Sequence, residues 1–310
     1  MECVQDHILD VRDYIDEPTE DLSEWSDSRI LRHINKEARR LGMLITKRNQ
    51  DYFGYDFMLP LTTDTYEYEI PMGAIRTVDV YTSGVTAAGD GVYTIASTAQ
   101  YSNVDQAELN VEDGELGSGY YTWGTKLIFT KGGANITTGY YARVRMIRAL
   151  PDILYGTMQS AAASTFLFRI GGVTNGTMEY VSNAYLGYGV KIYNGTGVGQ
   201  ERRIIGDSFD GTDHTLTLDS AWGTTPSGTV YFSLTLPFPQ EFEDPLAFGA
   251  AMRCKIKVED EQRELTAQYK ESIKMALDLI SPRNKDGGRR LRRTTSFVRG
   301  SRRTIVRSTP

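Results

Sequence analysis

The sequence predicts an α+β protein: an N-terminal helix and a C-terminal helix pair form a small bundle, and inserted β-strands form an antiparallel sandwich or barrel-like module. Two observations support this class. Apolar residues at helical spacing occur near the N-terminus and again after residue 244. Between them, short alternating segments accompany thirty glycines and nineteen tyrosines, which is typical of strands joined by tight turns. A chain of 310 residues has room for one large domain or two modest ones.

The first predicted helix begins after residues 25–28, whose serine and aspartate side chains can cap its N-terminus. Its apolar face is made by Ile30, Leu31, Ile34, Ala38 and Leu41. We expect the helix to end near Gly42, because glycine commonly follows the last helical turn.

The next segment predicts strands. Residues 65–70 alternate strictly, with aromatic or aliphatic side chains on one face and carboxylates on the other. A turn at residues 71–73 precedes a second run through residues 78–81, so we expect two strands around a turn. Residues 82–125 are rich in Gly, Ser, Thr and Ala and predict an irregular β insertion. Strands resume at residues 126–129 and 140–147.

A compact antiparallel module is predicted from residue 156 to residue 236, because short strands recur about every ten residues between glycine turns. The predicted strands are 166–170, 190–193, 202–205, 215–218 and 230–234.

Two helices are predicted after Pro239. Asp244 and Pro245 suit the N-terminus of the first helix, and residues 259–261 suit the start of the second. The second helix carries an apolar stripe at Leu265, Tyr269, Ile273, Leu277 and Ile280. Since each helix has a single apolar face to bury, we expect both to pack against the N-terminal helix.

Charge is unevenly distributed along the chain. Residues 282–310 hold ten Arg or Lys against Asp286 alone, a net charge of +9, so the formal net charge of -6 leaves -15 on residues 1–281. A basic tail can bind nucleic acid or an acidic protein surface, or remain a solvated end. Apolar residues are interleaved with its arginines, which an arm that only neutralises phosphates would not need. We interpret the tail as a docking strand.

Motifs for catalysis, cofactors or metals are weak. The glycine-rich run at residues 195–199 precedes a predicted strand, whereas a phosphate-binding loop requires a helix there. His7, His33 and His214 lack the spacing of a metal or acid-base site. Asp207, Asp210, Asp213 and Asp219 flank turns, where turn formation is favoured over calcium binding. We therefore expect no enzyme activity, no cofactor and no metal.

Other sequence features bear on the cellular location of the protein. Cys3 and Cys254 are too few for a disulfide scaffold and are expected to be reduced thiols. The Asn-x-Thr triplets at Asn135, Asn175 and Asn194 are interpreted as turns. No apolar run approaches the roughly 20 residues of a membrane helix, and the acidic N-terminus does not resemble a secretory signal. We expect an intracellular product or a particle component with no membrane partner.

Several stretches resemble the head-to-tail adaptor, or head completion, proteins of tailed bacteriophages. Residues 25–38 look like the first family helix, residues 66–71 with 75–81 look like its strand-turn-strand, and residues 239–269 look like its C-terminal helix pair. Separately, residues 195–204 through 219–222 and Pro226 are similar to a β module that recurs in phage virion proteins. The adaptor resemblance covers a little under half of the chain.

This resemblance implies a virion protein at the head-tail interface, assembled in the host cytoplasm. Family members form a homo-oligomeric ring, commonly of twelve copies, between the portal protein and a tail nozzle or other tail protein. Genomic DNA passes through the ring without sequence-specific binding. The segments implied are 1–81, the acidic leader with the first helix and strand pair; 82–125, the irregular insertion; 126–155, core strands; 156–236, the β module; 237–281, the helix pair; and 282–310, the basic docking tail.

We expect the tail to dock on the portal through an added strand and arginine-carboxylate pairs. The expected portal-docking residues are Arg289, Arg290, Arg292, Arg293, Phe297, Val298, Arg299, Arg302, Arg303, Ile305 and Val306. Two alternatives remain open. One is a tail fibre or receptor-binding protein whose β module binds glycans. The other is a DNA-binding packaging factor that uses the basic tail.

Overall fold

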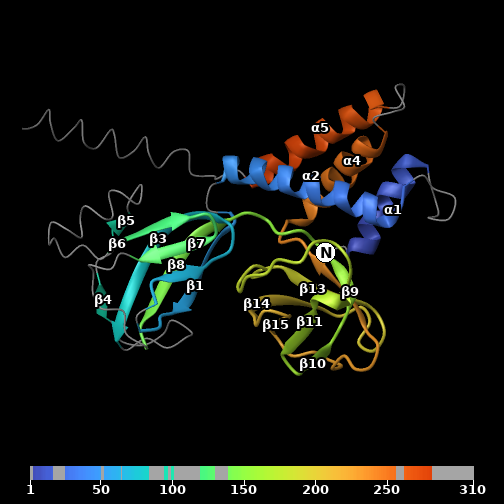
Figure 1. Ribbon diagram of the computed structural model, residues 1–310. Helices are drawn as coiled ribbons and strands as arrows, with labels where there is room; N and C mark the ends of the chain where they lie inside the picture. The colour runs from blue at the N-terminus through green and yellow to red at the C-terminus, as the bar shows by residue number, and fades with distance from the viewer. Residues whose placement is uncertain are drawn as a thin grey trace, which may run out of the picture.

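The computed structural model describes residues 3–16, 25–49, 52–63, 65–83, 94–96, 99–100, 119–129, 139–255 and 262–280. Figure 1 shows a helical bundle lying across two separate β regions, with one region under each end of the bundle. The predicted α+β class is therefore confirmed.

The bundle consists of four described helices, α1 (Val4–Ile15), α2 (Asp27–Arg48), α4 (Glu243–Cys254) and α5 (Gln262–Leu279). Helix α4 packs against α1, α2 and α5, so the N-terminal and C-terminal helices pack together as predicted. Helix α2 is long because its apolar residues keep helical spacing for six turns and are buried from Ile30 to Ile45. None of the described helices is both long and apolar enough to cross a bilayer.

Two features of these helices differ from the sequence prediction. Helix α1 was expected to be only an acidic leader, yet Val4, Ile8, Val11 and Ile15 occur at helical spacing and are buried. Helix α2 continues past Gly42, which therefore does not end it. A Cβ atom at residue 42 would collide with the Leu150 side chain, so glycine is there to allow close packing.

The first β region is a sandwich of two sheets. One sheet has the strand order β1-β8-β3-β4 and the other β2-β7-β6-β5. Their bounds are β1 (Gly54–Pro60), β2 (Glu67–Glu69), β3 (Gly73–Ser83), β4 (Thr94–Ala96), β5 (Ala99–Gln100), β6 (Gly119–Trp123), β7 (Lys126–Phe129) and β8 (Tyr141–Arg148). Phe57, Val80 and Val144 from the first sheet share a core with Leu127 and Phe129 from the second.

The predicted strand pair at residues 65–81 forms as two strands, but they do not pair with each other. Strand β2 pairs with β7, and β3 pairs with β8 and β4. The chain crosses between the two sheets around Ile70 and Pro71, and both residues are buried. The alternating pattern identified the strands, but it carries no information about which strand is the partner.

The second β region is one eight-stranded sheet with the order β10-β11-β15-β14-β13-β16-β9-β12. Its strands are β9 (Tyr155–Thr157), β10 (Ser160–Ala162), β11 (Thr165–Arg169), β12 (Val173–Asn175), β13 (Gly189–Asn194), β14 (Glu201–Phe209), β15 (Asp213–Leu218) and β16 (Tyr231–Thr235). The rings of Phe166 on β11 and Phe232 on β16 lie 4.9 Å apart. Four strand spacings in a flat sheet would separate them by about 19 Å. The sheet is therefore curled into a barrel-like shape.

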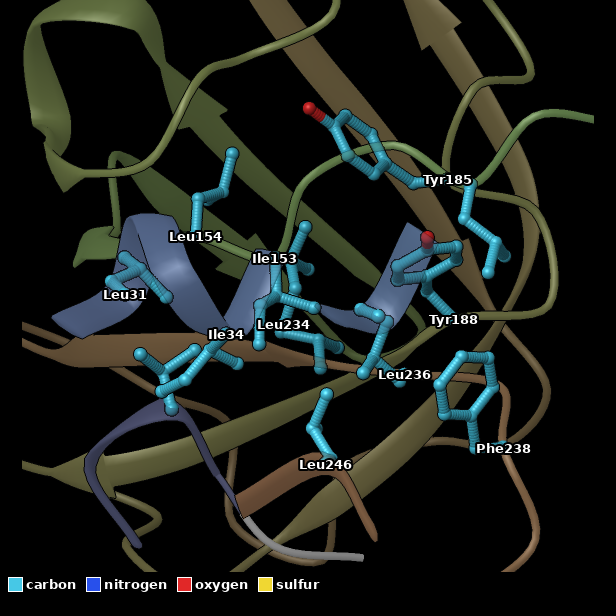
Figure 2. Packing of buried hydrophobic residues seen from close by; sticks show 14 of the residues in the cluster. Leu31, Ile34, Ile153, Leu154, Tyr185, Tyr188, Leu234, Leu236, Phe238 and Leu246 are labelled. Atoms are coloured by element: carbon cyan, nitrogen blue, oxygen red, sulfur yellow. The ribbon is translucent and has the colours of Figure 1, made fainter. Parts of the chain in front are cut away.

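The bundle and the curled sheet share one hydrophobic core. Figure 2 shows Leu31 and Ile34 of α2 beside Ile153, Leu154 and Leu234. The buried Asn35 side chain donates to the Ile153 carbonyl at 3.1 Å and accepts from the Ile153 amide at 2.9 Å. At the start of α1, the Val4 amide donates to the Ser233 hydroxyl at 2.9 Å. These contacts hold the helices on the sheet.

Candidate interaction surfaces

The predicted docking tail lies outside the described residues, which end at Ile280 beside the C-terminus of α5. The structure therefore neither brings the expected portal-docking residues together nor separates them. The surfaces that can be built from described residues lie on the bundle and on the curled sheet.

A buried carboxylate joins three helices of the bundle. The Glu37 side chain on α2 is fully buried. Its Oε2 accepts hydrogen bonds from the Nε and Nη2 atoms of Arg253 on α4, at 3.1 and 2.9 Å. Its Oε1 accepts from the hydroxyl of Tyr269 on α5. The pKa of Tyr269 is raised mainly by burial of its hydroxyl and secondly by the hydrogen bond to Glu37. The network thus ties α2 to both C-terminal helices.

The Glu37 network also fixes the outer face of α2. A Cβ atom at Gly249 on α4 would lie 2.5 Å from the Glu37 side chain, so α4 can approach α2 this closely only because residue 249 is glycine. The guanidinium of Arg40, one turn along α2, lies 5.2 Å from the Tyr269 ring centroid. The basic side chains on the outer face therefore project from a helix that contacts both α4 and α5 through this network.

A groove of about 990 Å³ runs between this face of α2 and the ends of β3 and β8. Its floor is apolar and includes Met43, Phe53, Ile75, Ile147 and Leu150. Its charged lining residues are all basic: Lys36, Arg39, Arg40 and Lys47 on α2 and Arg76 on β3. Met43 is 68% exposed whereas Phe53 and Leu150 are buried, so Met43 supplies the most accessible apolar surface of the groove.

The groove is basic because few described carboxylates offset its rim. Arg39 pairs with Asp152 at 2.9 Å, and Arg40 approaches Glu37 at 3.5 Å. Lys36 and Lys47 have no acidic partner within the described residues. Lys36, Arg40, Met43 and Lys47 are spaced i, i+4, i+7 and i+11, a second stripe on α2 that the sequence analysis missed. Three basic residues and a methionine at helical spacing, with no acidic residue among them, were the signal in the sequence that could have predicted this basic face.

The glycine run at residues 195–199 forms the turn between β13 and β14, with positive φ at Gly195, Gly197 and Gly199. A strand follows it, as predicted. The adjacent Gln200 side chain binds the loop between β15 and β16. Its Nε2 donates to the Thr224 carbonyl at 2.8 Å, and its Oε1 accepts from the Gly223 amide at 2.7 Å. Arg202 donates to the Ala221 carbonyl at 2.9 Å. Gln200 and Arg202 therefore connect the β13–β14 turn to the loop at residues 221–224.

The aspartates near turns form protein contacts. Asp210 accepts from the amides of Thr212 and Asp213, which is turn chemistry. Asp213 receives two hydrogen bonds from Arg169, at 2.7 and 2.9 Å. Asp207 is buried against His214, with 2.6 Å between Oδ1 and Nδ1. Within the described ranges, no group of three His, Cys, Asp or Glu side chains could hold a metal ion.

The three histidines lie on different elements, α1, α2 and β15. His214 is buried between aromatic rings, and its Nε2 lies 2.7 Å from the Glu179 carbonyl. Both ring nitrogens thus face hydrogen-bond acceptors. His33 contacts the Trp25 ring. Its pKa is lowered mainly by burial and secondly by the positive charges of Lys36 and Arg32. These surroundings hold His33 and His214 in structural contacts.

No family model matches the chain, and no curated protein matches it.

Proposed function

We propose that this protein is a head-to-tail adaptor, a structural virion protein that forms a ring between the portal and the tail and lines the DNA exit channel. One observation carries the proposal. The N-terminal and C-terminal helical segments that resemble the adaptor family lie some 200 residues apart, yet they pack as one bundle around Glu37. The β regions are inserted between these segments.

The charge distribution supports a role beside DNA. Residues 1–281 carry a net charge of -15. A channel that must let DNA pass should repel phosphates, because each neutralised phosphate adds a salt-dependent hold on the duplex. In this proposal DNA passes without sequence-specific binding, and the protein has no enzymatic role.

The basic tail attaches the ring to the portal. Helix α5 ends at Leu279, so a chain ending after Ser281 retains every described element. We expect this truncated chain to fold normally but to lose co-sedimentation with portal oligomers, whereas the full chain binds. A matched full-length variant, with Phe297, Val298, Ile305 and Val306 all changed to Ser, keeps every arginine. Loss of binding in that variant would support strand addition. Normal binding by the truncated chain would overturn the docking role of the tail.

The curled sheet, which contains most of the predicted module at residues 156–236, contacts the tail nozzle, other tail proteins or neighbouring copies in this proposal. It shares its core with the helices, so deleting it would also disturb the bundle. A surface change is the sharper test: Val198 is 62% exposed at the β13–β14 turn, and Val198→Asp should leave portal binding intact while weakening tail attachment. Unchanged attachment would count against this contact. A stable free trimer that ignores the portal and binds glycans would instead favour the tail-fibre alternative.

A further inference from the structure

Within the described residues, strand β1 lies at the edge of its sheet and pairs with β8 alone. The pairing has no register shift over seven residues, and the Leu61 amide continues it by donating to the Tyr140 carbonyl at 2.8 Å. The odd-numbered residues therefore bond to β8, because bonding alternates along an antiparallel strand. The N–H and C=O groups of Asp56 and Met58 point away from β8. Pro60 has no N–H and falls on the same free edge, which is where strands accommodate proline.

A cleft of about 970 Å³ lies beside this free edge. One wall is β1 from Gly54 to Met58, and the opposite wall includes residues 203–206 of β14. Leu186, which precedes β13, lines the cleft and packs against the core of the sandwich, so it joins the two walls. Figure 1 shows β1 on the side of the first β region that faces β14. A regular edge strand beside an open cleft is a template for another strand.

The opposite wall carries a β-bulge. Ile204 pairs with Leu218, and Gly206 pairs with Thr217, so the strand β14 has one residue more than β15 at this point. The extra residue is Ile205, which is 58% exposed and lines the cleft. Bulges of this kind re-aim a side chain. Here the bulge presents an isoleucine where an apolar side chain of an added strand can cover it.

The charged side chains of the cleft are balanced. Asp56 accepts a hydrogen bond from Nε of Arg143 at 2.6 Å, and Asp219 accepts one from the Arg203 amide at 3.2 Å. These four are the charged residues that line the cleft, two of each sign. A phosphate backbone or an acidic helix therefore finds no excess of positive charge here. A folded sheet of another molecule is also disfavoured, because β14 closes the far side, whereas a single extended segment can enter.

We propose that an extended, uncharged segment of a tail protein enters this cleft and adds to β1 as a further strand. Its backbone bonds to Asp56 and Met58, with about four hydrogen bonds if it runs antiparallel to β1. An apolar side chain of the segment covers Ile205. The inference rests on the proposed function for the identity of the partner, since that proposal places the curled sheet against the tail. The acceptor edge itself follows from the register of β1.

Amide hydrogen exchange of the free full-length protein, resolved to single residues, tests the edge first. The amides of Asp56 and Met58 should exchange fast, whereas the Phe57 amide, which bonds to β8, should exchange slowly. Slow exchange at Asp56 and Met58 would show that the chain already covers this edge and would overturn the proposal.

Binding is tested with a random library of ten-residue peptides, selected on the full-length protein. The bound peptides should alternate apolar residues, and a synthesised binder should slow exchange at Asp56 and Met58. Met58→Pro removes the free N–H and should weaken this binder at least about tenfold, whereas Met58→Ala keeps the N–H and should weaken it less.

A second variant does not alter the backbone. Ile205→Lys should also weaken the peptide about tenfold, since it replaces the apolar contact by a charge. Met275→Lys is the matched control, because Met275 on α5 is equally exposed at 58% and lies outside the cleft. A selection that yields no binder sensitive to both Met58→Pro and Ile205→Lys overturns the proposed site.

The outcomes separate this inference from the adaptor proposal. Portal binding does not use the cleft, so Met58→Pro should co-sediment with portal oligomers like the native chain but attach tails poorly. Normal tail attachment by both Met58→Pro and Ile205→Lys would overturn the tail protein as the occupant. A native chain that ignores the portal but binds the selected peptides would support the strand site and count against the adaptor role. Competition for the cleft by a synthetic peptide of residues 282–310 would identify a second copy of this chain as the occupant and overturn the proposal.

Discussion

The close approach of α4 to α2 makes a quantitative prediction for Gly249→Ala. The three atoms nearest to a Cβ at this position all belong to the Glu37 side chain, at 2.5 to 2.8 Å. Overpacking of this kind costs about 1–3 kcal/mol. Replacing glycine by alanine inside a helix also stabilises the folded protein by about 0.5–1 kcal/mol. The net effect on the intact protein should be a destabilisation of about 1 kcal/mol.

The same substitution should behave differently once Glu37 is truncated. Glu37→Ala alone should cost about 3–5 kcal/mol, because it leaves Arg253 and Tyr269 without their partner. It also removes the three atoms that lie nearest to the Gly249→Ala methyl group. In that background, Gly249→Ala should therefore stabilise the protein by about 0.5–1 kcal/mol. The coupling free energy between the two sites should be about 2 kcal/mol.

Urea unfolding of the four proteins, followed by far-UV circular dichroism, measures this coupling from the midpoints and m values. The measurement should be made in the cold so that Glu37→Ala remains folded. Equal costs of Gly249→Ala in both backgrounds would refute the claim that Glu37 occupies the space beside residue 249. The argument that α4 packs closely against α2 at Glu37 would then fail.

Three further predictions concern the core and the loops. Asn35→Ala should destabilise the protein by about 2–4 kcal/mol in urea unfolding, because the buried amide and carbonyl of Ile153 lose their partners; a loss under 1 kcal/mol would contradict this. Gln200→Ala should lower stability by about 1–2 kcal/mol and speed hydrogen exchange at the Gly223 amide, and unchanged exchange would count against the hydrogen bond between Gln200 and Gly223. Burial raises the pKa of Asp152 despite the pairing with Arg39, so the stability this group contributes is fullest below about pH 4 and is lost as pH rises through its raised pKa. Asp152→Asn should therefore gain stability relative to the native protein between about pH 4 and pH 7, and a flat difference across that range would refute the assignment.

Helical and strand periodicity explain why much of the fold could be predicted from the sequence. The strands at residues 126–129 and 166–218 were found because alternation and glycine turns are local signals. The packing of the N-terminal and C-terminal helices followed from their single apolar faces. Helix α1 was missed because residues 1–27 hold ten carboxylates, a composition typical of an exposed acidic segment, although Val4, Ile8, Val11 and Ile15 have helical spacing.

Long-range features could not be predicted in the same way. The Glu37 network joins residues 216 and 232 positions apart, and a buried glutamate looks like any surface glutamate on a helix. Gly42 was expected to end α2, since sequence alone does not show that Leu150 lies against it. The groove requires α2 and β3 to be neighbours, which only the structure shows. The predicted docking tail lies outside the described residues and stays a prediction.

The native mass of the purified protein, alone and after mixing with a portal oligomer, tests the adaptor proposal most directly. The proposal predicts a monomer near 34.7 kDa that becomes a multi-copy ring when the portal is present. A free trimer whose mass does not change on adding portal would contradict the adaptor role.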